Sequence, residues 1–270
     1  MKLPIIKSAI IAGGLALCAS SAYAGDALTV VSWGGAYTKS QIEAYHKPYT
    51  AKYGTKIQSE DYNGGLAEIR AQVEAGKITW DVVDLEVSDA ARGCDDGLFE
   101  KISAGSLPNG VNGALPSKDF IPGALQECAV GTIVWSTIYA YDADKYKSKK
   151  PTTISDFFDV KKFPGKRGMR KVPKVNLEWA LMADGVDGKD VYKVLATKAG
   201  QDRAFKKLDT IKNDVLWWEA GAQPPQMLAD GEVVMTSAYN GRIFNAAVTE
   251  KKKFYIKFLL MYLNNLVIVF

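Results

Sequence analysis

The feature that most constrains the fold of this chain is an alternation between short apolar runs and amphipathic segments. Residues 28–33 form an apolar run, residues 37–53 carry the spacing of an amphipathic helix, and the same order recurs at 56–59, 66–75 and 80–85. Strands that are joined through helices pair in parallel, and the crossover rule places helices on both faces of the sheet. The pattern therefore predicts an α/β fold that begins with a βαβαβ unit.

The alternation restarts after a Gly-, Pro- and Asn-rich passage at 105–122. Residues 129–141 form a run of β-branched and aromatic residues, which is more typical of two strands, or of one long strand passing between two domains, than of a helix. Beyond it the sequence predicts helices at 154–159, 177–183, 201–212, 225–230 and 242–248, and strands at 166–172, 215–218 and 233–239. The simplest organisation is two α/β lobes, residues 25–136 and 137–250, joined near 136–141.

The N-terminus has the pattern of a secretory signal peptide. Lys2 and Lys7 precede an apolar stretch at 9–19, and small residues flank a cleavage point before Gly25. The apolar stretch is shorter than the ~20 residues that a membrane-spanning helix needs. A lipoprotein attached through Cys18 is the alternative, but Leu17 stands where the lipid-attachment pattern requires a small residue. Residues 1–24 are therefore predicted to be a cleaved signal peptide.

Two cysteines, Cys94 and Cys128, remain once the signal peptide is removed. An exported chain folds in an oxidising compartment, where an even number of cysteines favours pairing. A disulfide here would stabilise the fold by about 4 kcal/mol on the chain-entropy model. Two buried free thiols are the alternative.

The charge of the chain argues against two classes of function. The formal net charge is +4, but residues 25–250 carry 28 Lys or Arg against 30 Asp or Glu, a balance of about −2, so a nucleic-acid-binding surface is not expected. The chain has a single histidine, His46. Catalysis through a histidine base and histidine-rich metal sites are therefore poor hypotheses, and we expect no catalytic residues, metal or cofactor.

The last twenty residues have an unusual composition. Residues 251–270 contain only Lys, Asn, Phe, Tyr, Ile, Leu, Met and Val, and neither a helical nor a strand period organises them. We interpret this stretch as an aberrant tail produced by a change of reading frame. A membrane anchor is the competing interpretation, but the apolar part, residues 258–270, is too short and contains Asn264 and Asn265.

The candidate site residues follow the predicted strands, because ligands of open α/β sheets bind beyond the carboxyl ends of the strands. Aromatic side chains and carboxylates are concentrated there, a combination that suits an organic cation with an alkyl body. The candidates by position are Trp33, Tyr62, Glu86, Trp135, Trp218, Tyr239 and Arg242. Gly34-Gly35 and Gly64-Gly65 lie at the same turns, where a missing Cβ lets the backbone approach a ligand, and neither pair fits a nucleotide-binding motif.

Each candidate also has a structural interpretation. Any single ring can simply pack in the core, and at most one of Trp217 and Trp218 can point to a cleft, because they alternate along one strand. Glu86 can instead cap the helix that follows it. Seven basic residues at 161–174 suggest a solvated loop, or alternatively an anion-accepting edge of the cleft or a docking patch for a partner.

Several motifs together resemble the spermidine/putrescine-type periplasmic solute-binding proteins of ABC transporters. They are WGGAY at 33–37, WDVVDLE at 80–86, GTIVWST at 131–137, PTTISDFFD at 151–159, and DGEVVM at 230–235 followed by YNG at 239–241. The resemblance implies a two-lobed periplasmic-binding-protein fold of type II, incomplete here at the C-terminus because the stretch that returns to the first lobe is missing. It also adds Tyr37 to the candidate ligand-binding residues and implies an aromatic box for an alkyl chain.

The function implied by the resemblance is capture of a polyamine-like or related amine-bearing solute in the periplasm and delivery to a membrane permease, by a monomer without catalysis. Where polyamine binders carry an acidic pair, this chain has Arg170 and Lys171 to Val175, and Arg242 adds another cation. A zwitterionic or anionic solute is therefore the alternative on the same fold. An exported hydrolase that uses Glu86 and Glu219 as acid and base is the alternative from another class.

Overall fold

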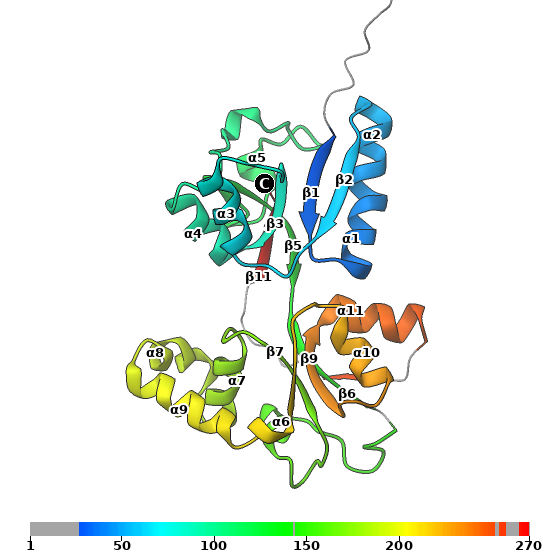
Figure 1. Ribbon diagram of the computed structural model, residues 1–270, viewed down its shortest axis with the longest axis vertical. Coiled ribbons are helices and arrows are strands. Elements are labelled where there is room, and N and C mark those ends of the chain that lie inside the picture. Colours follow the sequence, from blue (N-terminus) through cyan, green and yellow to red (C-terminus); the bar gives the residue numbers. More distant parts are fainter. Residues whose placement is uncertain (1–26, 143, 252–253, 258–264, 270) are drawn as a thin grey trace, which may run out of the picture.

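The computed structural model describes residues 27–142, 144–251, 254–257 and 265–269. The described residues form two lobes, each built around its own β-sheet, one above the other in Figure 1. The predicted signal peptide, residues 1–24, lies outside the described residues. No helix in the described part of the chain is both long enough and apolar enough to cross a membrane.

The sheet of the first lobe has the strand order β2-β1-β3-β11-β5-β4. Its strands are β1 (Leu28–Ser32), β2 (Ile57–Asp61), β3 (Val82–Glu86), β4 (Leu125–Gln126), β5 (Ala129–Trp135) and β11 (Asn265–Val269). Strand β1 pairs in parallel with both β2 and β3, as the βαβαβ pattern predicts. The helices are α1 (Gly35–Gln41), α2 (Lys47–Tyr53), α3 (Ala67–Ala75), α4 (Val87–Asp95) and α5 (Pro116–Asp119), with a 3₁₀ turn at Ala104–Ser106.

The long helix predicted at 37–53 is interrupted by a π-helical turn, Ile42–His46, between α1 and α2. Pro48 stands in the first turn of α2. Proline has no N–H to donate to the carbonyl four residues earlier, so the widened turn just before it absorbs the missing hydrogen bond.

The sheet of the second lobe has the strand order β10-β6-β9-β7-β8. Its strands are β6 (Thr137–Asp142), β7 (Arg167–Arg170), β8 (Val215–Trp218), β9 (Met235–Tyr239) and β10 (Phe254–Lys257). The helices are α6 (Ile154–Phe158), α7 (Asn176–Ala183), α8 (Val191–Leu195), α9 (Lys198–Asp209), α10 (Gln223–Ala229) and α11 (Asn240–Phe244), with a π-helical turn at Asn245–Thr249 and 3₁₀ turns at Gly188–Asp190 and Lys212–Asp214. The sequence did not predict α8, whose five residues are too short for a clear helical period.

The run at 129–141 forms two strands that belong to different sheets. Strand β5 ends at Trp135 and β6 begins at Thr137, so the chain passes from the first sheet to the second at Ser136. The N–H of Ser136 donates to Asn240 Oδ1 (3.1 Å), and the N–H of Asn240 donates to Ser136 O (3.0 Å). This reciprocal pair fixes the crossing to the start of α11.

Each lobe has its own buried core. In the second lobe Tyr139, Phe157 and Trp179 are fully buried and contact one another edge to face or at a tilt. In the first lobe Val31 and Leu85, from adjacent strands, are fully buried beneath the helices. Burial of side chains of this size stabilises the fold by about 2–3 kcal/mol each, so each sheet has a rigid base for the residues at its edge.

The predicted disulfide is present and joins Cys94 of α4 to Cys128 in the turn between β4 and β5. The expectation that the chain does not return to the first lobe is wrong. Strand β10 pairs antiparallel with β6, and β11 lies between β3 and β5 in the first sheet. Backbone hydrogen bonds of a strand do not depend on side-chain periodicity, which explains why the pattern of residues 251–270 did not reveal them. The change of reading frame stays a prediction.

Candidate ligand-binding site

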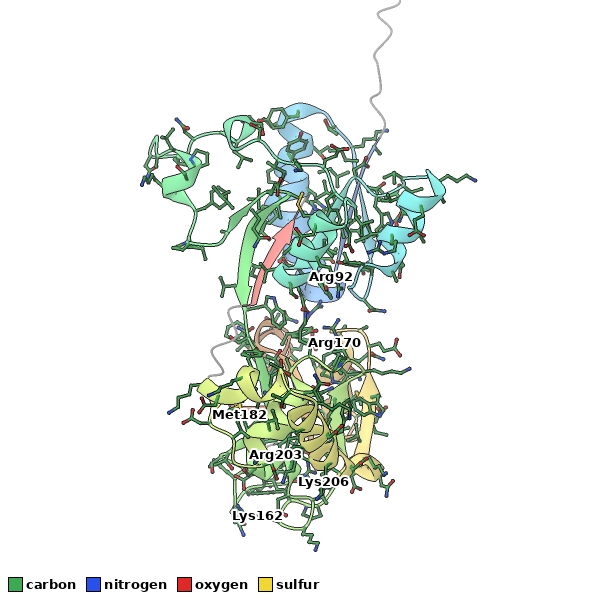
Figure 2. The ribbon with its side chains drawn as sticks, turned by 90° about the vertical axis from the view of Figure 1, so that its left-hand side faces the viewer. Arg92, Lys162, Arg170, Met182, Arg203 and Lys206 are labelled. Atoms are coloured by element: carbon green, nitrogen blue, oxygen red, sulfur yellow. A yellow bond between two sulfur atoms is a disulfide. The ribbon has the colours of Figure 1, made fainter. Side chains whose placement is uncertain are left out.

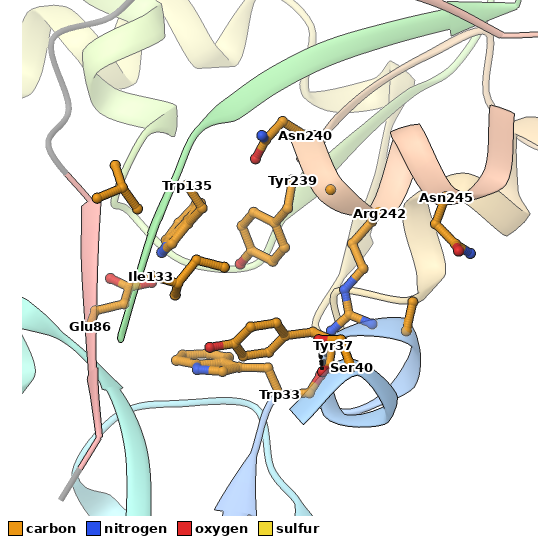
Figure 3. A pocket seen from close by; sticks show the side chains of 13 residues that line it. Trp33, Tyr37, Ser40, Glu86, Ile133, Trp135, Tyr239, Asn240, Arg242 and Asn245 are labelled. Atoms are coloured by element: carbon orange, nitrogen blue, oxygen red, sulfur yellow. Dashed lines mark hydrogen bonds between the residues drawn. The ribbon is translucent and has the colours of Figure 1, made fainter. Parts of the chain in front are cut away.

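A cavity of about 320 Å³ lies where the edges of the two sheets meet (Figure 3). The first lobe contributes α1 and the ends of β3 and β5, and the second lobe contributes the end of β9 and the start of α11. The lining residues are Trp33, Ala36, Tyr37, Ser40, Glu86, Ile133, Val134, Trp135, Tyr239, Asn240, Gly241, Arg242 and Asn245. Six of the eight predicted binding residues therefore lie around one cavity: Trp33, Tyr37, Glu86, Trp135, Tyr239 and Arg242.

Aromatic rings form much of the cavity wall. Trp135 and Tyr239, at the ends of β5 and β9, meet edge to face across the crossing between the lobes, with ring centroids 4.7 Å apart. Trp33 and Tyr37 face them from the first lobe (Figure 3). Rings from both lobes therefore present flat apolar surface to anything held in the cavity.

Tyr62 and Trp218 do not line this cavity. Tyr62 is buried, packs against Trp33 with ring centroids 5.3 Å apart, and donates its hydroxyl hydrogen to Asp84 O (2.5 Å). Trp218 is 1% exposed and packs edge to face behind Tyr239, where it borders a second cavity of about 10 Å³, room for one water molecule. Both rings support the wall residues. Side chains alternate along β8 as predicted: Trp217 faces outward and is 50% exposed, whereas Trp218 faces the core.

Glu86 is buried at the end of β3, and its carboxylate contacts the second lobe. Its Oε1 accepts from Arg170 Nη1 (3.2 Å) and its Oε2 accepts from Lys174 Nζ. The residue stands at the N-cap position of α4, but its side chain makes no capping hydrogen bond. The interpretation of Glu86 as a helix cap is therefore wrong, and its partners are two cations that lie 84 and 88 residues further along the chain.

Arg170 crosses from the second lobe to the first (Figure 2). Its guanidinium lies 5.6 Å from the ring of Trp33 and 6.0 Å from the ring of Tyr239, and its Nη2 donates to Asn63 O (2.8 Å). These distances are within the range of cation–π interactions. Trp33 and Tyr239, which were predicted to bind the solute, thus contact an arginine of the protein itself.

The basic run at 161–174 is not a simple solvated loop. Arg167 is fully buried and donates to the carbonyl oxygens of Phe157 (2.7 Å), Phe163 (2.6 Å) and Gly165 (2.6 Å). Arg170, as described above, reaches the lobe junction. A run of like charges in a sequence does not reveal side-chain direction, which here alternates along β7.

Arg242 is 7% exposed and also bridges the lobes. Its Nη2 donates to Trp33 O (2.8 Å), whereas its Nη1 is buried without a hydrogen-bond partner among the described residues. Burial lowers its pKa, an effect that the nearby Tyr239, Asp61 and Tyr37 oppose. An arginine remains protonated in proteins, so the cavity wall carries a positive charge with a donor to spare.

Gly35 and Gly64 were expected to let the backbone approach a ligand. They instead leave space for the side chains of Arg242 and Trp33. A Cβ on Gly35 (φ +57°) would lie 2.4 Å from Arg242 Nη1, and a Cβ on Gly64 (φ +86°) would lie 2.3 Å from the indole of Trp33. Any other residue at these positions would displace the guanidinium or the ring, besides being strained at positive φ.

The sequence reasoning missed Asp84, which is fully buried in β3. Its Oδ2 accepts from Ser32 Oγ (2.9 Å) and Gln41 Nε2 (2.8 Å), and Tyr37 of the cavity wall also hydrogen-bonds it. Burial raises its pKa to about 6, against the lowering effect of these hydrogen bonds. An acid inside an otherwise apolar strand was the available signal, since a buried carboxyl needs dedicated partners.

Glu86 and Glu219 are the two carboxylates that an exported hydrolase would use as acid and base. Glu219 is exposed, pairs with Lys171 at 3.2 Å, and does not line the cavity, so the two carboxylates do not flank a common substrate position. The described residues contain no group of three or more His, Cys, Asp or Glu placed to hold a metal ion.

Comparison with known proteins agrees with the fold. The family of bacterial extracellular solute-binding proteins matches residues 44–265. The chain therefore belongs to this family, whose fold is the periplasmic-binding-protein fold that the sequence predicted.

The names of three relatives state the solute that each one binds. A γ-aminobutyric-acid-binding protein of Pseudomonas aeruginosa is 48% identical over 230 residues, which are 85% of this chain and 63% of that protein. The solved structure of the PBP MotA from A. tumefaciens B6 in complex with glucopine is 31% identical, with a TM-score of 0.77 and coverage of 85% of this chain and 68% of that one. A solved structure of a GABA receptor is also 31% identical, with a TM-score of 0.71 and coverage of 90% and 71%.

Proposed function

We propose that the protein is the solute-binding component of an ABC transporter and that it captures a small solute carrying both a carboxylate and an amine, such as γ-aminobutyric acid. The solute occupies the cavity between the lobes, and the loaded protein delivers it to a membrane permease. The family is extracellular, and the signal peptide predicted at 1–24 agrees with export to the periplasm. The protein acts by binding and release, without catalysis.

The balance of charge at the lobe junction carries this proposal. Arg170 and Lys174 both pair with Glu86, and Arg242, which has Asp61 nearby, adds a third cation to the junction, so three cations face two acids. A polyamine would add positive charges to a junction that already has an excess of them, whereas a carboxylate would relieve it. The unpartnered Nη1 of Arg242 supplies a donor for such a group, and hydrogen bonds between charged partners are the stronger class.

The cavity walls fit the rest of such a solute. Trp33, Trp135 and Tyr239 present apolar ring surface to a short alkyl chain, and the faces of the same rings attract its single ammonium through cation–π interactions. The relatives point the same way, because two of them are γ-aminobutyric acid binders and a third holds glucopine. None of these comparisons specifically supports a polyamine as the solute.

Capture between two lobes also provides a mechanism for signalling that the site is loaded. Arg170 and Arg242 of the second lobe hydrogen-bond the first lobe at Asn63 O and Trp33 O. A solute that contacts both lobes binds the closed arrangement better than an open one, so it shifts the population toward closure. The crossing at Ser136 is the position about which the lobes would turn.

Isothermal titration calorimetry tests the proposal directly. The wild-type protein should bind γ-aminobutyric acid, and Arg242→Met should weaken that binding by at least tenfold, because a hydrogen bond to a charged group contributes about 1.5–3 kcal/mol. Arg203→Met is a matched control, since Arg203 pairs with Asp184 on the exposed surface of the second lobe. Binding of putrescine or spermidine, with no binding of any amino acid, would contradict the proposal.

A further inference from the structure

We propose that Lys174 determines specificity as an internal counter-cation: its ammonium occupies, against Glu86, the place that the ammonium of a cationic solute would take. Diamines and polyamines are thereby excluded from a cavity that otherwise has the aromatic walls and the carboxylate to hold them. This inference rests on the proposed function and names the residue that selects among its amine-bearing solutes.

The carboxylate of Glu86 has no free oxygen. Arg170 takes Oε1 and Lys174 takes Oε2, and Lys174 Nζ also donates to Ser88 Oγ (3.0 Å). The Glu86 side chain is 8% exposed, and that of Lys174 is 38% exposed, so the ammonium closes the remaining access to a nearly buried carboxylate. A second ammonium has no oxygen left to approach and would meet two positive charges.

The backbone around Lys174 holds it in this position. The next residue, Val175, has φ +71° and ψ −41°, a region close to the γ-turn that β-branched residues rarely adopt. Asn176 Nδ2 closes the turn by donating to the carbonyl oxygens of Arg170 and Val172, both at 2.7 Å. Strained backbone of this kind persists where the surroundings fix it, and it is concentrated at functional sites.

Lys171 lies in the same loop as Lys174 but has a different environment. Lys171 is 66% exposed and pairs with Glu219, away from the cavity. Lys174, directly before the turn at Val175, is thus directed to the lobe junction, whereas Lys171, three residues earlier, lies at the surface. Without the Lys174 ammonium, Oε2 of Glu86 would be free beside a cavity that Glu86 itself lines.

The test compares Lys174→Met, which removes the ammonium and keeps the aliphatic stem, with Lys174→Arg, which keeps the charge. Titration calorimetry with putrescine should show an affinity at least tenfold higher for Lys174→Met than for wild type, and no gain for Lys174→Arg. Lys171→Met, from the same loop, should behave as wild type. The double variant Lys174→Met/Glu86→Gln should lose the gain, because the freed carboxylate is gone.

Two results would overturn the inference. One is a folded Lys174→Met protein, with the near-ultraviolet circular dichroism of wild type, that gains no affinity for putrescine. The other is a tenfold or greater loss of γ-aminobutyric acid binding in Lys174→Met, which would make Lys174 a ligand of the solute carboxylate. If Lys174→Met does not fold, Lys174→Gln provides the same comparison with a polar side chain.

The outcome for wild type separates this inference from the proposed function. If wild type binds no amino acid but Lys174→Met gains putrescine binding, the inference stands and the proposed function fails. If wild type binds γ-aminobutyric acid and neither neutral variant gains putrescine binding, the proposed function stands and the inference fails.

Discussion

Asp84→Asn should change how the stability of the protein depends on pH. Asp84 is fully buried in β3, directly behind the cavity wall, where Ser32, Gln41 and Tyr37 hydrogen-bond it. Burial raises the pKa of this carboxyl from 3.8 to about 6, although the three hydrogen bonds act in the opposite direction. The folded protein therefore holds this proton more tightly than the unfolded chain does.

The sign and size of the effect follow from that difference. At a pH well below 3.8 the carboxyl is protonated in both states, and its burial costs little. As the pH rises toward 6 the unfolded chain loses the proton first, so the free energy of unfolding falls by about 1.4 kcal/mol per pH unit. Above the folded pKa the loss is complete, and a shift of this size corresponds to about 3 kcal/mol.

Urea unfolding followed by tryptophan fluorescence at pH 4 to 8 measures this loss. Asparagine does not titrate, so the free energy of unfolding of Asp84→Asn should gain about 2 kcal/mol relative to wild type between pH 4 and pH 7. Other titrating groups cancel in the difference. Ser32→Ala removes a hydrogen bond that lowers the pKa of Asp84, so the loss of stability with rising pH should continue to a higher pH and become larger. Parallel curves for wild type and Asp84→Asn across this range would refute the reasoning.

Two further substitutions test the fold. Cys94→Ser/Cys128→Ser opens the loop that the disulfide closes, a sequence separation of 34 residues, and should lower the free energy of unfolding by about 4 kcal/mol. Thermal or urea unfolding would detect this change. Unchanged unfolding would show that the disulfide does not constrain the unfolded chain. For Asp156, burial raises the pKa, but hydrogen bonds from Lys162 and from the backbone of residues 152 and 153 outweigh it and lower the pKa to about 2. Its stabilising contribution is therefore present above pH 4 and lost as the pH falls toward 2, so Asp156→Asn should unfold in acid over a less steep pH range than wild type, and an identical acid transition would contradict this.

Periodicity and the parallel pairing of the first strands could be predicted from the sequence because they depend on residues and elements that are neighbours along the chain. The spacing at 28–85 indicated parallel β1, β2 and β3, and the run at 129–141 indicated a passage between two domains. Most candidate site residues could be selected for the same reason. The carboxyl ends of parallel strands meet at one edge of a sheet, so Trp33, Glu86 and Tyr239 were placed at such edges before any tertiary contact was known.

The sequence alone determined the α/β class, the two lobes and the type of side chain at the edges of the sheets. Only the tertiary structure decided which charges meet, because Glu86 finds its cations 84 and 88 residues away and Arg242 reaches a carbonyl 209 residues away. Those pairs depend on how the edges of two separately built sheets approach each other. Local preferences specify each element, but the partner of a buried charge is set by the packing that removes it from water.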